Sequence, residues 1–293
     1  MDIMPAPQRD PPAMEEWIND IDDIEFESHG PIRRMFKTMV LNPLVNYMPA
    51  PITKGLLKIT KSELAEANWN DPGGWRSMVI SYEGKPPQIA DKLLVGGGSV
   101  PTALRNRKRL GAAVLSRLIE QSDGDNAHIL CLGAGPGITI IEALRRSQGG
   151  AHATLVDISN DAFDYGRQLA DSEGVGDRVR YVLGDVRDID ELLHEPPDIV
   201  TMIGICEYLT DEQIVEIITA AASVMPAGGA IVFNSISKKH GTDRFFRRVF
   251  GLHMNYRGPL ELQGLMGQAG FADFTAVPEP LGVYHMIVGR RLA

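Results

Sequence analysis

The chain has 293 residues, of which 44% are hydrophobic, and it carries a formal net charge of −9. This composition supports a sizeable core and argues against global disorder, and without a run of about 18 apolar residues we expect no membrane span. The N-terminal sequence MDIMPAPQRDPP lacks the pattern of a secretion signal, and two cysteines are too few for a disulfide framework, so we expect a cytoplasmic protein.

Acidic and basic residues are unevenly distributed along the chain. Residues 1–30 hold nine acids and one base, and residues 31–125 hold eight acids and fourteen bases. Residues 126–293 hold twenty-one acids and fourteen bases, which disfavours binding of nucleic acid by this part. The basic middle is equally suited to attracting an anionic substrate and to docking on the acidic remainder.

The first 125 residues divide into an arm and a helical cap. Residues 1–30 form an acidic arm with four prolines near its start, which disfavour regular structure. Residues 31–125 show helical periodicity without alternating strands, and we expect them to form a cap or lid. Thr60 with Glu63 fits a capping box. The last helix of the cap is expected over residues 101–121.

Strand-like and helical runs alternate from residue 126 to the end. This alternation is typical of a doubly wound α/β domain, with a mostly parallel sheet covered by helices on both faces. The predicted strands are 128–132, 153–157, 179–184, 199–203, 230–235, 274–278 and 284–290, and the predicted helices are 138–146, 161–173, 211–225 and 260–269. Ligands of such sheets bind outside the carboxyl ends of the strands.

The sequence Gly133-Ala134-Gly135-Pro136-Gly137 lies between the first predicted strand and a helix. Glycines there allow a tight turn and close approach of a ligand, and the helix N-terminus offers unpaired N–H donors. A dinucleotide turn requires G-x-G-x-x-G, and neither register of these glycines provides the third one. The spacing therefore fits a nicotinamide cofactor poorly.

Two acids end the next strands and extend this site. Asp157 ends the second strand, where a carboxylate can accept both hydroxyls of a ribose. Asp185 follows Gly184 at the end of the third strand, where it can accept the amine of an adenine while Val186 packs against the ring. A helix cap or a turn aspartate is the structural alternative for each.

With these residues the region 126–293 resembles the class I S-adenosylmethionine-dependent methyltransferases of the small-molecule branch, with a seven-stranded Rossmann-like sheet. The segment from Asp198 to Leu209 and the turn Pro226-Ala227-Gly228-Gly229 also look like the family. The resemblance implies that S-adenosylmethionine is the cofactor. It places the following residues at the cofactor: Gly133, Ala134, Gly135, Pro136, Gly137, Asp157, Ile158, Gly184, Asp185, Val186 and Gly204.

Cys131 is the departure from the family pattern. Members usually carry Asp or Glu two residues before the first glycine, so a carboxylate near the methionine end is missing here. We interpret Cys131 and Cys206 as small buried apolar residues, and two cysteines without matching histidines predict no metal site.

Polar residues after the fourth and fifth strands are the candidates for catalysis. Glu207 could act as a base or cap a helix, and the ring of Tyr208 could attract a sulfonium. His253 and Tyr256 before the last helix complete the predicted catalytic set. In the cap, the residues that could line the site are Tyr47, Met48, Trp69, Trp75 and Tyr82, and the alternative is that these side chains belong to the core. The cluster Arg105, Arg107, Lys108 and Arg109 could meet an anion, but a solvated helix face is favoured.

These residues predict a methyltransferase that acts on a small molecule, such as a secondary metabolite or a lipid-like acceptor. The alternative keeps the cofactor but transfers or cyclises its aminocarboxypropyl arm and releases methylthioadenosine. A non-catalytic binding module is a third hypothesis and a dehydrogenase a distant fourth. We expect a small-molecule substrate and no nucleic acid as partners, and leave a homodimer open.

Overall fold

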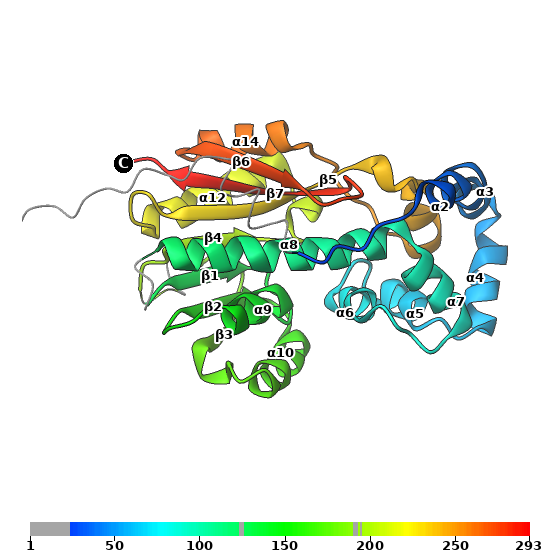
Figure 1. The fold of residues 1–293 in the computed structure, drawn as a ribbon, viewed down its shortest axis with the longest axis horizontal. Coiled ribbons are helices and arrows are strands. Elements are labelled where there is room, and N and C mark those ends of the chain that lie inside the picture. Colours follow the sequence, from blue (N-terminus) through cyan, green and yellow to red (C-terminus); the bar gives the residue numbers. More distant parts are fainter. Residues whose placement is uncertain (1–23, 123–125, 190–192, 194) are drawn as a thin grey trace, which may run out of the picture.

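The computed structural model describes residues 24–122, 126–189, 193 and 195–293. Most of the predicted acidic arm therefore lies outside the described residues. The described part of the arm, residues 24–30, runs along the long helix α8 (Ser99–Gln121) (Figure 1). Arg105 of α8 forms an ion pair with Glu27, at 2.6 Å between Nη2 and Oε2, and Asn106 bonds the Glu27 backbone.

Seven strands form one sheet in the order β3-β2-β1-β4-β5-β7-β6 (Figure 1). Strands β3, β2, β1, β4 and β5 are parallel, and β7 is antiparallel to both β5 and β6. The link from β6 to β7 is too short for a parallel crossover, which explains the change of direction. The strands are β1 (His128–Leu132), β2 (His152–Asp157), β3 (Val179–Leu183), β4 (Ile199–Met202), β5 (Ala230–Ile236), β6 (Phe271–Pro278) and β7 (Tyr284–Arg291). The predicted doubly wound α/β fold is confirmed.

Helices cover both faces of this sheet because its central strands are apolar on both sides. Ile129 and Cys131 of β1 face one core, while Leu130 and Leu132 face the other. The first core is closed by α8, α9 (Ile138–Arg146) and α10 (Asn160–Ser172), and the second by α12 (Asp211–Val224) and α14 (Pro259–Gln268). Short 3-10 turns connect several of these elements: η3 (Gly176–Arg178), η4 (Cys206–Tyr208) and η5 (Lys238–His240).

The cap lies beyond the carboxyl ends of the parallel strands (Figure 1). Its first segment consists of α2 (Pro31–Phe36), η1 (Lys37–Leu41), α3 (Asn42–Tyr47), α4 (Ala50–Ile59), α5 (Glu63–Asn70), α6 (Trp75–Glu83), α7 (Ile89–Asp91) and η2 (Lys92–Gly96). Two of its stretches, η1 and η2, have π-helical hydrogen bonding. In the described part of the chain, none of the helices combines the length and the apolar character needed to cross a bilayer.

A second segment of the cap comes from the loop between β5 and α14. It contains α13 (Asp243–Phe245) and η6 (Phe246–Phe250), and shares a core with α4, α5 and the start of α8. Trp69 Nε1 donates to the carbonyl of Val249 at 2.8 Å, and Arg248 donates to that of Asn46 at 2.7 Å. The cap thus has two segments that are far apart in sequence, and α8 joins it to the sheet, with its first turns in the cap and its later turns on β1 and β7.

The predicted capping box at Thr60 is wrong. The N-cap of α5 is Ser62, whose hydroxyl accepts from the Ala65 N–H at 3.0 Å. Thr60 instead ends α4, and its hydroxyl donates to the Leu56 carbonyl at 2.8 Å. The buried carboxylate of Asp91 accepts the hydroxyl of Ser62 and the N–H of Glu63, so a residue distant in sequence fixes the start of α5.

Candidate active site

The turn after β1 is built around glycines with positive φ. Gly137 (φ +77°) packs so closely on Leu155 that a Cβ would overlap that side chain. At Gly135 (φ +52°) a Cβ would meet only Trp75 of the cap, at 3.6 Å. The backbone at Gly135 is therefore left open toward the space between the sheet and the cap, as a ligand-binding turn requires.

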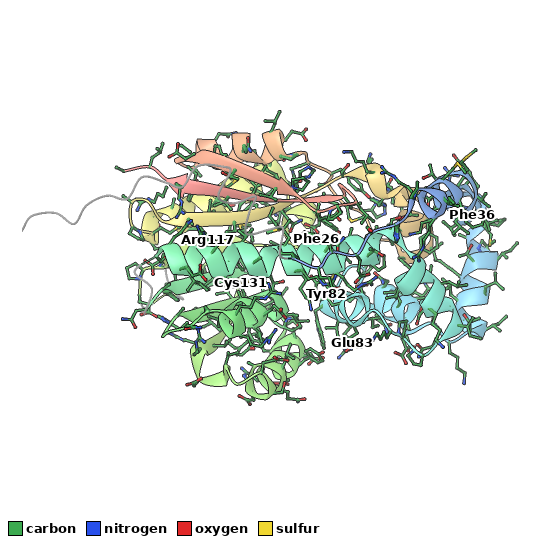
Figure 2. The ribbon with its side chains drawn as sticks, in the orientation of Figure 1. Phe26, Phe36, Tyr82, Glu83, Arg117 and Cys131 are labelled. Atoms are coloured by element: carbon green, nitrogen blue, oxygen red, sulfur yellow. The ribbon has the colours of Figure 1, made fainter. Side chains whose placement is uncertain are left out.

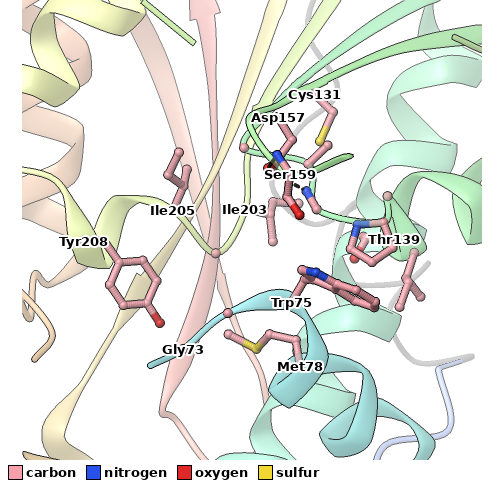
Figure 3. A pocket seen from close by; sticks show the side chains of 18 of the residues that line it. Gly73, Trp75, Met78, Cys131, Thr139, Asp157, Ser159, Ile203, Ile205 and Tyr208 are labelled. Atoms are coloured by element: carbon pink, nitrogen blue, oxygen red, sulfur yellow. Dashed lines mark hydrogen bonds between the residues drawn. The ribbon is translucent and has the colours of Figure 1, made fainter. Parts of the chain in front are cut away.

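Asp157 at the end of β2 fixes this turn. Its Oδ2 accepts the Gly135 N–H at 2.7 Å and its Oδ1 accepts the Ser159 N–H at 2.9 Å (Figure 3). A carboxylate offers about four acceptor positions, so each oxygen keeps one for a ligand hydroxyl. The acid expected to hold a ribose also organises the glycine turn.

A cavity of about 510 Å³ lies over the turn, and we call it the glycine-turn cavity. Its walls come from the ends of β1 to β4 and from α6 of the cap, including Trp75 and Met78 (Figure 3). Ten of the eleven predicted cofactor residues line it, and Gly184, whose N–H donates to the Asp157 carbonyl at 3.1 Å, does not. That these residues contact the cofactor stays a prediction.

Asp185 is at the rim of the glycine-turn cavity and binds Arg187. The Arg187 Nη2 lies 2.6 Å from Oδ2, and its Nε lies 3.0 Å from Oδ1. Hydrogen bonds from Arg187 lower the pKa of Asp185 to about 2, so this carboxylate is ionised at neutral pH. Ile158, which is 78% exposed, and Val186 offer apolar surface on the same wall.

A second cavity of about 620 Å³ lies inside the cap, and we call it the apolar cavity. Its lining is mostly aliphatic and aromatic and comes from both cap segments, for example Leu57, Leu104 and Phe246. The two cavities share Gly73, Met78 and Tyr208 as wall residues. Tyr208 is 37% exposed, and its side chain forms part of the wall of both cavities.

A buried ion pair separates the cavities. Arg107 of α8 lines the glycine-turn cavity and Glu207 of η4 lines the apolar cavity, with 3.5 Å between Nη1 and Oε1. Both side chains are 2% exposed. Arg107 also donates to the Tyr82 hydroxyl at 2.8 Å and lies over the ring of Tyr284.

These contacts set the protonation of the buried groups. Burial alone would lower the pKa of Arg107, but the oxygens of Tyr82, Tyr284 and Glu207 outweigh it and raise that pKa above its ordinary value. Burial, with the Glu207 carboxylate, raises the pKa of Tyr208. The guanidinium is therefore charged and the Tyr208 phenol neutral.

Five buried polar atoms at this junction lack a hydrogen-bond partner among the described residues. They are Oε2 of Glu207, Oγ1 of Thr201, Nδ2 of Asn234, and Nε and Nη1 of Arg107. Thr201 lines the glycine-turn cavity, and Asn234 accepts the Gly204 N–H at 2.6 Å. Buried polar atoms are nearly always satisfied, so unpartnered ones beside a cavity point to a ligand.

The other predicted catalytic residues lie elsewhere. The Tyr256 hydroxyl donates to Asp243 at 2.9 Å and contacts His240 Nε2 at 3.0 Å, and neither Tyr256 nor His253 lines one of the two cavities. Burial raises the pKa of the Cys131 and Cys206 thiols, and the two face opposite cores, as expected for small apolar residues.

The arginines of α8 are less exposed than the sequence predicts. The predicted solvated face is wrong for Arg105 and Arg107, which are 7% and 2% exposed. Thr201 and Met78 carried no signal in the sequence, because each is an ordinary member of a strand or helix until the fold places it on a cavity wall.

Comparison with known proteins identifies the sheet domain. Residues 129–229 match the family model described as a methyltransferase domain. The chain is 24% identical over 117 residues to the tRNA 5-carboxymethoxyuridine methyltransferase of Escherichia coli K12, covering 40% of this chain and 43% of that protein. It is 29% identical over 164 residues to the phenazine O-methyltransferase of Lysobacter antibioticus, covering 53% and 46%. The chain thus spans less than half the length of these two relatives.

A solved structure shows the same fold. Magnesium protoporphyrin IX methyltransferase from Synechocystis, with bound S-adenosylhomocysteine, superposes with a TM-score of 0.56 at 14% identity, covering 81% of this chain and 99% of that one. At this identity the likeness concerns the fold. The family model, the glycine turn and the sheet order agree, and they identify residues 129–229 as a methyltransferase domain with the fold of the class I S-adenosylmethionine-dependent methyltransferases.

Proposed function

We propose that this chain transfers a methyl group from S-adenosylmethionine to a nucleophilic atom of an apolar small molecule. The observation that carries the proposal is the pair of cavities that meet at Tyr208. One lies on the glycine turn, and the other is apolar and has no ligand-binding turn of its own. Such a division suits one polar and one apolar reactant.

The glycine-turn cavity fits the cofactor. Gly135 leaves backbone open to it, Asp157 keeps free acceptor positions for a ribose, and the Thr201 hydroxyl is unpartnered. Ile158 and Val186 would sandwich the adenine near Asp185. Cys131 lines the wall as a neutral thiol, so the methionine end is held without a carboxylate at that position.

The apolar cavity fits an acceptor with a large hydrophobic body. Aromatic side chains of the second cap segment, Phe245, Phe246 and Phe250, line it together with aliphatic residues of α4 and α8. The volume of about 620 Å³ is that of a pocket for a drug-sized molecule. The phenazine O-methyltransferase among the relatives supports this class of acceptor.

Residues at the junction would align and deprotonate the acceptor. When bound, S-adenosylmethionine supplies a methyl group on a sulfonium, which a nucleophile displaces in line. The Tyr208 ring lines both cavities and would attract that positive charge. Glu207 Oε2, buried and unpartnered, would accept the proton of the acceptor hydroxyl or amine as the new bond to the methyl carbon forms. Arg107 holds Glu207 in place.

The product of the reaction tests the proposal. The full chain would be incubated with S-adenosylmethionine and a panel of apolar phenols, amines and carboxylic acids, and the products identified by mass. S-adenosylhomocysteine and a methylated acceptor are expected. Methylthioadenosine as the product would overturn methyl transfer in favour of the aminocarboxypropyl alternative, which the names of the matched proteins do not support.

A substitution at Glu207 tests the assignment of the base. Glu207→Gln should lower kcat roughly a hundredfold or more, because general-base catalysis contributes about that much. Cofactor affinity should hardly change, which also checks that the variant is folded. Glu212→Gln, at an exposed carboxylate on α12, is the matched control. A Glu207→Gln enzyme as active as the control would exclude the proposed role.

A further inference from the structure

The outer surface of the first cap segment is unusually apolar. We call residues 31–61, which form α2, η1, α3, α4 and the turn after it, the cap face. Eleven large hydrophobic side chains between Ile32 and Ile59 are exposed there, among them Ile32 at 79%, Met39 at 70% and Tyr47 at 71%. These helices lie together at one end of the molecule, and Phe36 projects there (Figures 1 and 2). Exposed apolar patches of this size mark interaction surfaces.

An ordinary surface helix buries its apolar side chains, whereas these helices expose most of theirs. From α2 to α3 the one buried side chain is Lys37, while the apolar side chains face outward or are only half-buried. Helix α4 buries Thr53 and Leu57 against the fold and presents Ile52, Leu56 and Ile59 on its exposed side, at spacings of four and three. The second apolar stripe of α4 has no partner among the described residues.

The charge of the cap face defines the partner. Residues 31–61 contain six lysines and arginines and no acid, and all six except the buried Lys37 are at least partly exposed. None of the six forms an ion pair among the described residues. Protein interfaces of this apolar character are depleted in lysine, whereas a bilayer surface takes apolar side chains into its acyl region and cations at its phosphates. We propose that the cap face docks on an anionic lipid bilayer.

Docking would bring the apolar cavity to the membrane. Phe36, Leu44 and Leu56 are at least half exposed and also line the apolar cavity, so the cavity opens on the cap face. A hydrophobic acceptor dissolved in the bilayer would then enter the cavity without crossing water. This consequence rests on the proposed function, whereas the docking itself does not.

Vesicle sedimentation of the full chain tests the proposal. Vesicles of phosphatidylcholine with phosphatidylglycerol should carry the protein down, and high salt or phosphatidylcholine alone should weaken binding, because the cations act through screened attraction. The Ile52→Ser/Ile59→Ser variant should lose at least tenfold in binding. Its control, Leu260→Ser/Leu292→Ser, should keep the wild-type value. The exposures are closely matched, 55% and 81% in the variant against 54% and 81% in the control.

Three results would overturn the proposal. One is a protein that sediments with neither vesicle. The second is an equal loss of binding in both double variants. The third is light scattering that shows a dimer dissolved by Ile52→Ser/Ile59→Ser, which assigns the face to a second copy of the chain. S-adenosylmethionine affinity, measured in parallel, shows that each variant is folded, and a failure of docking would leave the transferase proposal standing.

Discussion

Asp157 has two roles at the glycine turn, and a substitution of this one residue tests them. It organises the glycine turn through Gly135 and keeps acceptor positions facing the glycine-turn cavity. Hydrogen bonds to charged groups contribute about 1.5–3 kcal/mol, so Asp157→Ala should weaken S-adenosylmethionine binding roughly ten- to a hundredfold. Isothermal titration measures it, with the exposed Asp164 on α10 changed to Ala as the control. Unchanged affinity in Asp157→Ala would contradict the cofactor assignment.

The Arg107–Glu207 pair is buried between two cavities, so each partner depends on the other. Removing one partner of a buried pair typically costs about 3–5 kcal/mol, because the remaining charge is left uncompensated. Arg107→Met should therefore lower the free energy of unfolding by about that much.

A double variant distinguishes lost pairing from lost packing. Arg107→Met/Glu207→Met removes both charges and should recover part of the stability that Arg107→Met loses, as measured by urea denaturation. If Glu207→Met lowered the free energy of unfolding by the same amount in the Arg107→Met variant as in the wild-type chain, the two side chains would not be coupled.

At the scale of elements, the start of α5 shows how a contact distant in sequence can replace a local signal. Asp91 lies just before η2 but accepts from Ser62 and from the N–H of Glu63, both at the start of α5. Asp91→Ala would leave buried donors unpaired, and we expect a loss of about 2–3 kcal/mol in stability. Thr60→Ala, at the position that local sequence favours as the cap, should cost less than about 1 kcal/mol. Thermal unfolding of both variants would rank them, and the reverse order would show that Asp91 is not the main cap.

At the scale of the whole molecule, the second cap segment makes stability depend on pH. His240 is 1% exposed, and its Nε2 donates to the Tyr256 hydroxyl because that hydroxyl donates to Asp243. Burial lowers the pKa of His240 to about 4 from 6.5. Between about pH 4 and pH 6.5 the unfolded chain binds more protons at this histidine than the folded chain does. The contribution of neutral His240 to the free energy of unfolding is therefore fully present above about pH 6.5 and is lost as the pH drops toward 4.

The expected loss in the free energy of unfolding is roughly 2–3 kcal/mol for His240, a figure that follows from the size of its pKa shift. His29, whose pKa burial also lowers to about 4, adds a loss in the same direction. His240→Gln keeps a donor for Tyr256 without a titrating ring, so its stability should fall less steeply between pH 6.5 and 4. Urea denaturation across this range gives the slope. A slope equal to that of the wild-type chain would rule out His240 as a major contributor.

The sequence by itself determined the sheet domain. Its central strands are continuous apolar runs because both faces are buried, and its glycine turn requires positive φ, so both features are encoded locally. Each predicted strand and helix after residue 126 has a counterpart in the structure with closely similar bounds. The resemblance that rests on Gly133, Asp157 and Gly184-Asp185 agrees with the methyltransferase-domain model that residues 129–229 match.

Only the tertiary structure decided how the cap and its apolar cavity are built. Helical periodicity marks one apolar face, so it could not show that Arg105 and Arg107 are buried where the arm and the cap cover the other side of α8. Nor could it show that residues after β5 complete the cap or that Thr201 reaches a cavity. The exposed apolar side of α4 likewise appears only once Thr53 and Leu57 are seen to be its buried side. Contacts between segments far apart in sequence set these features, and no local pattern records them.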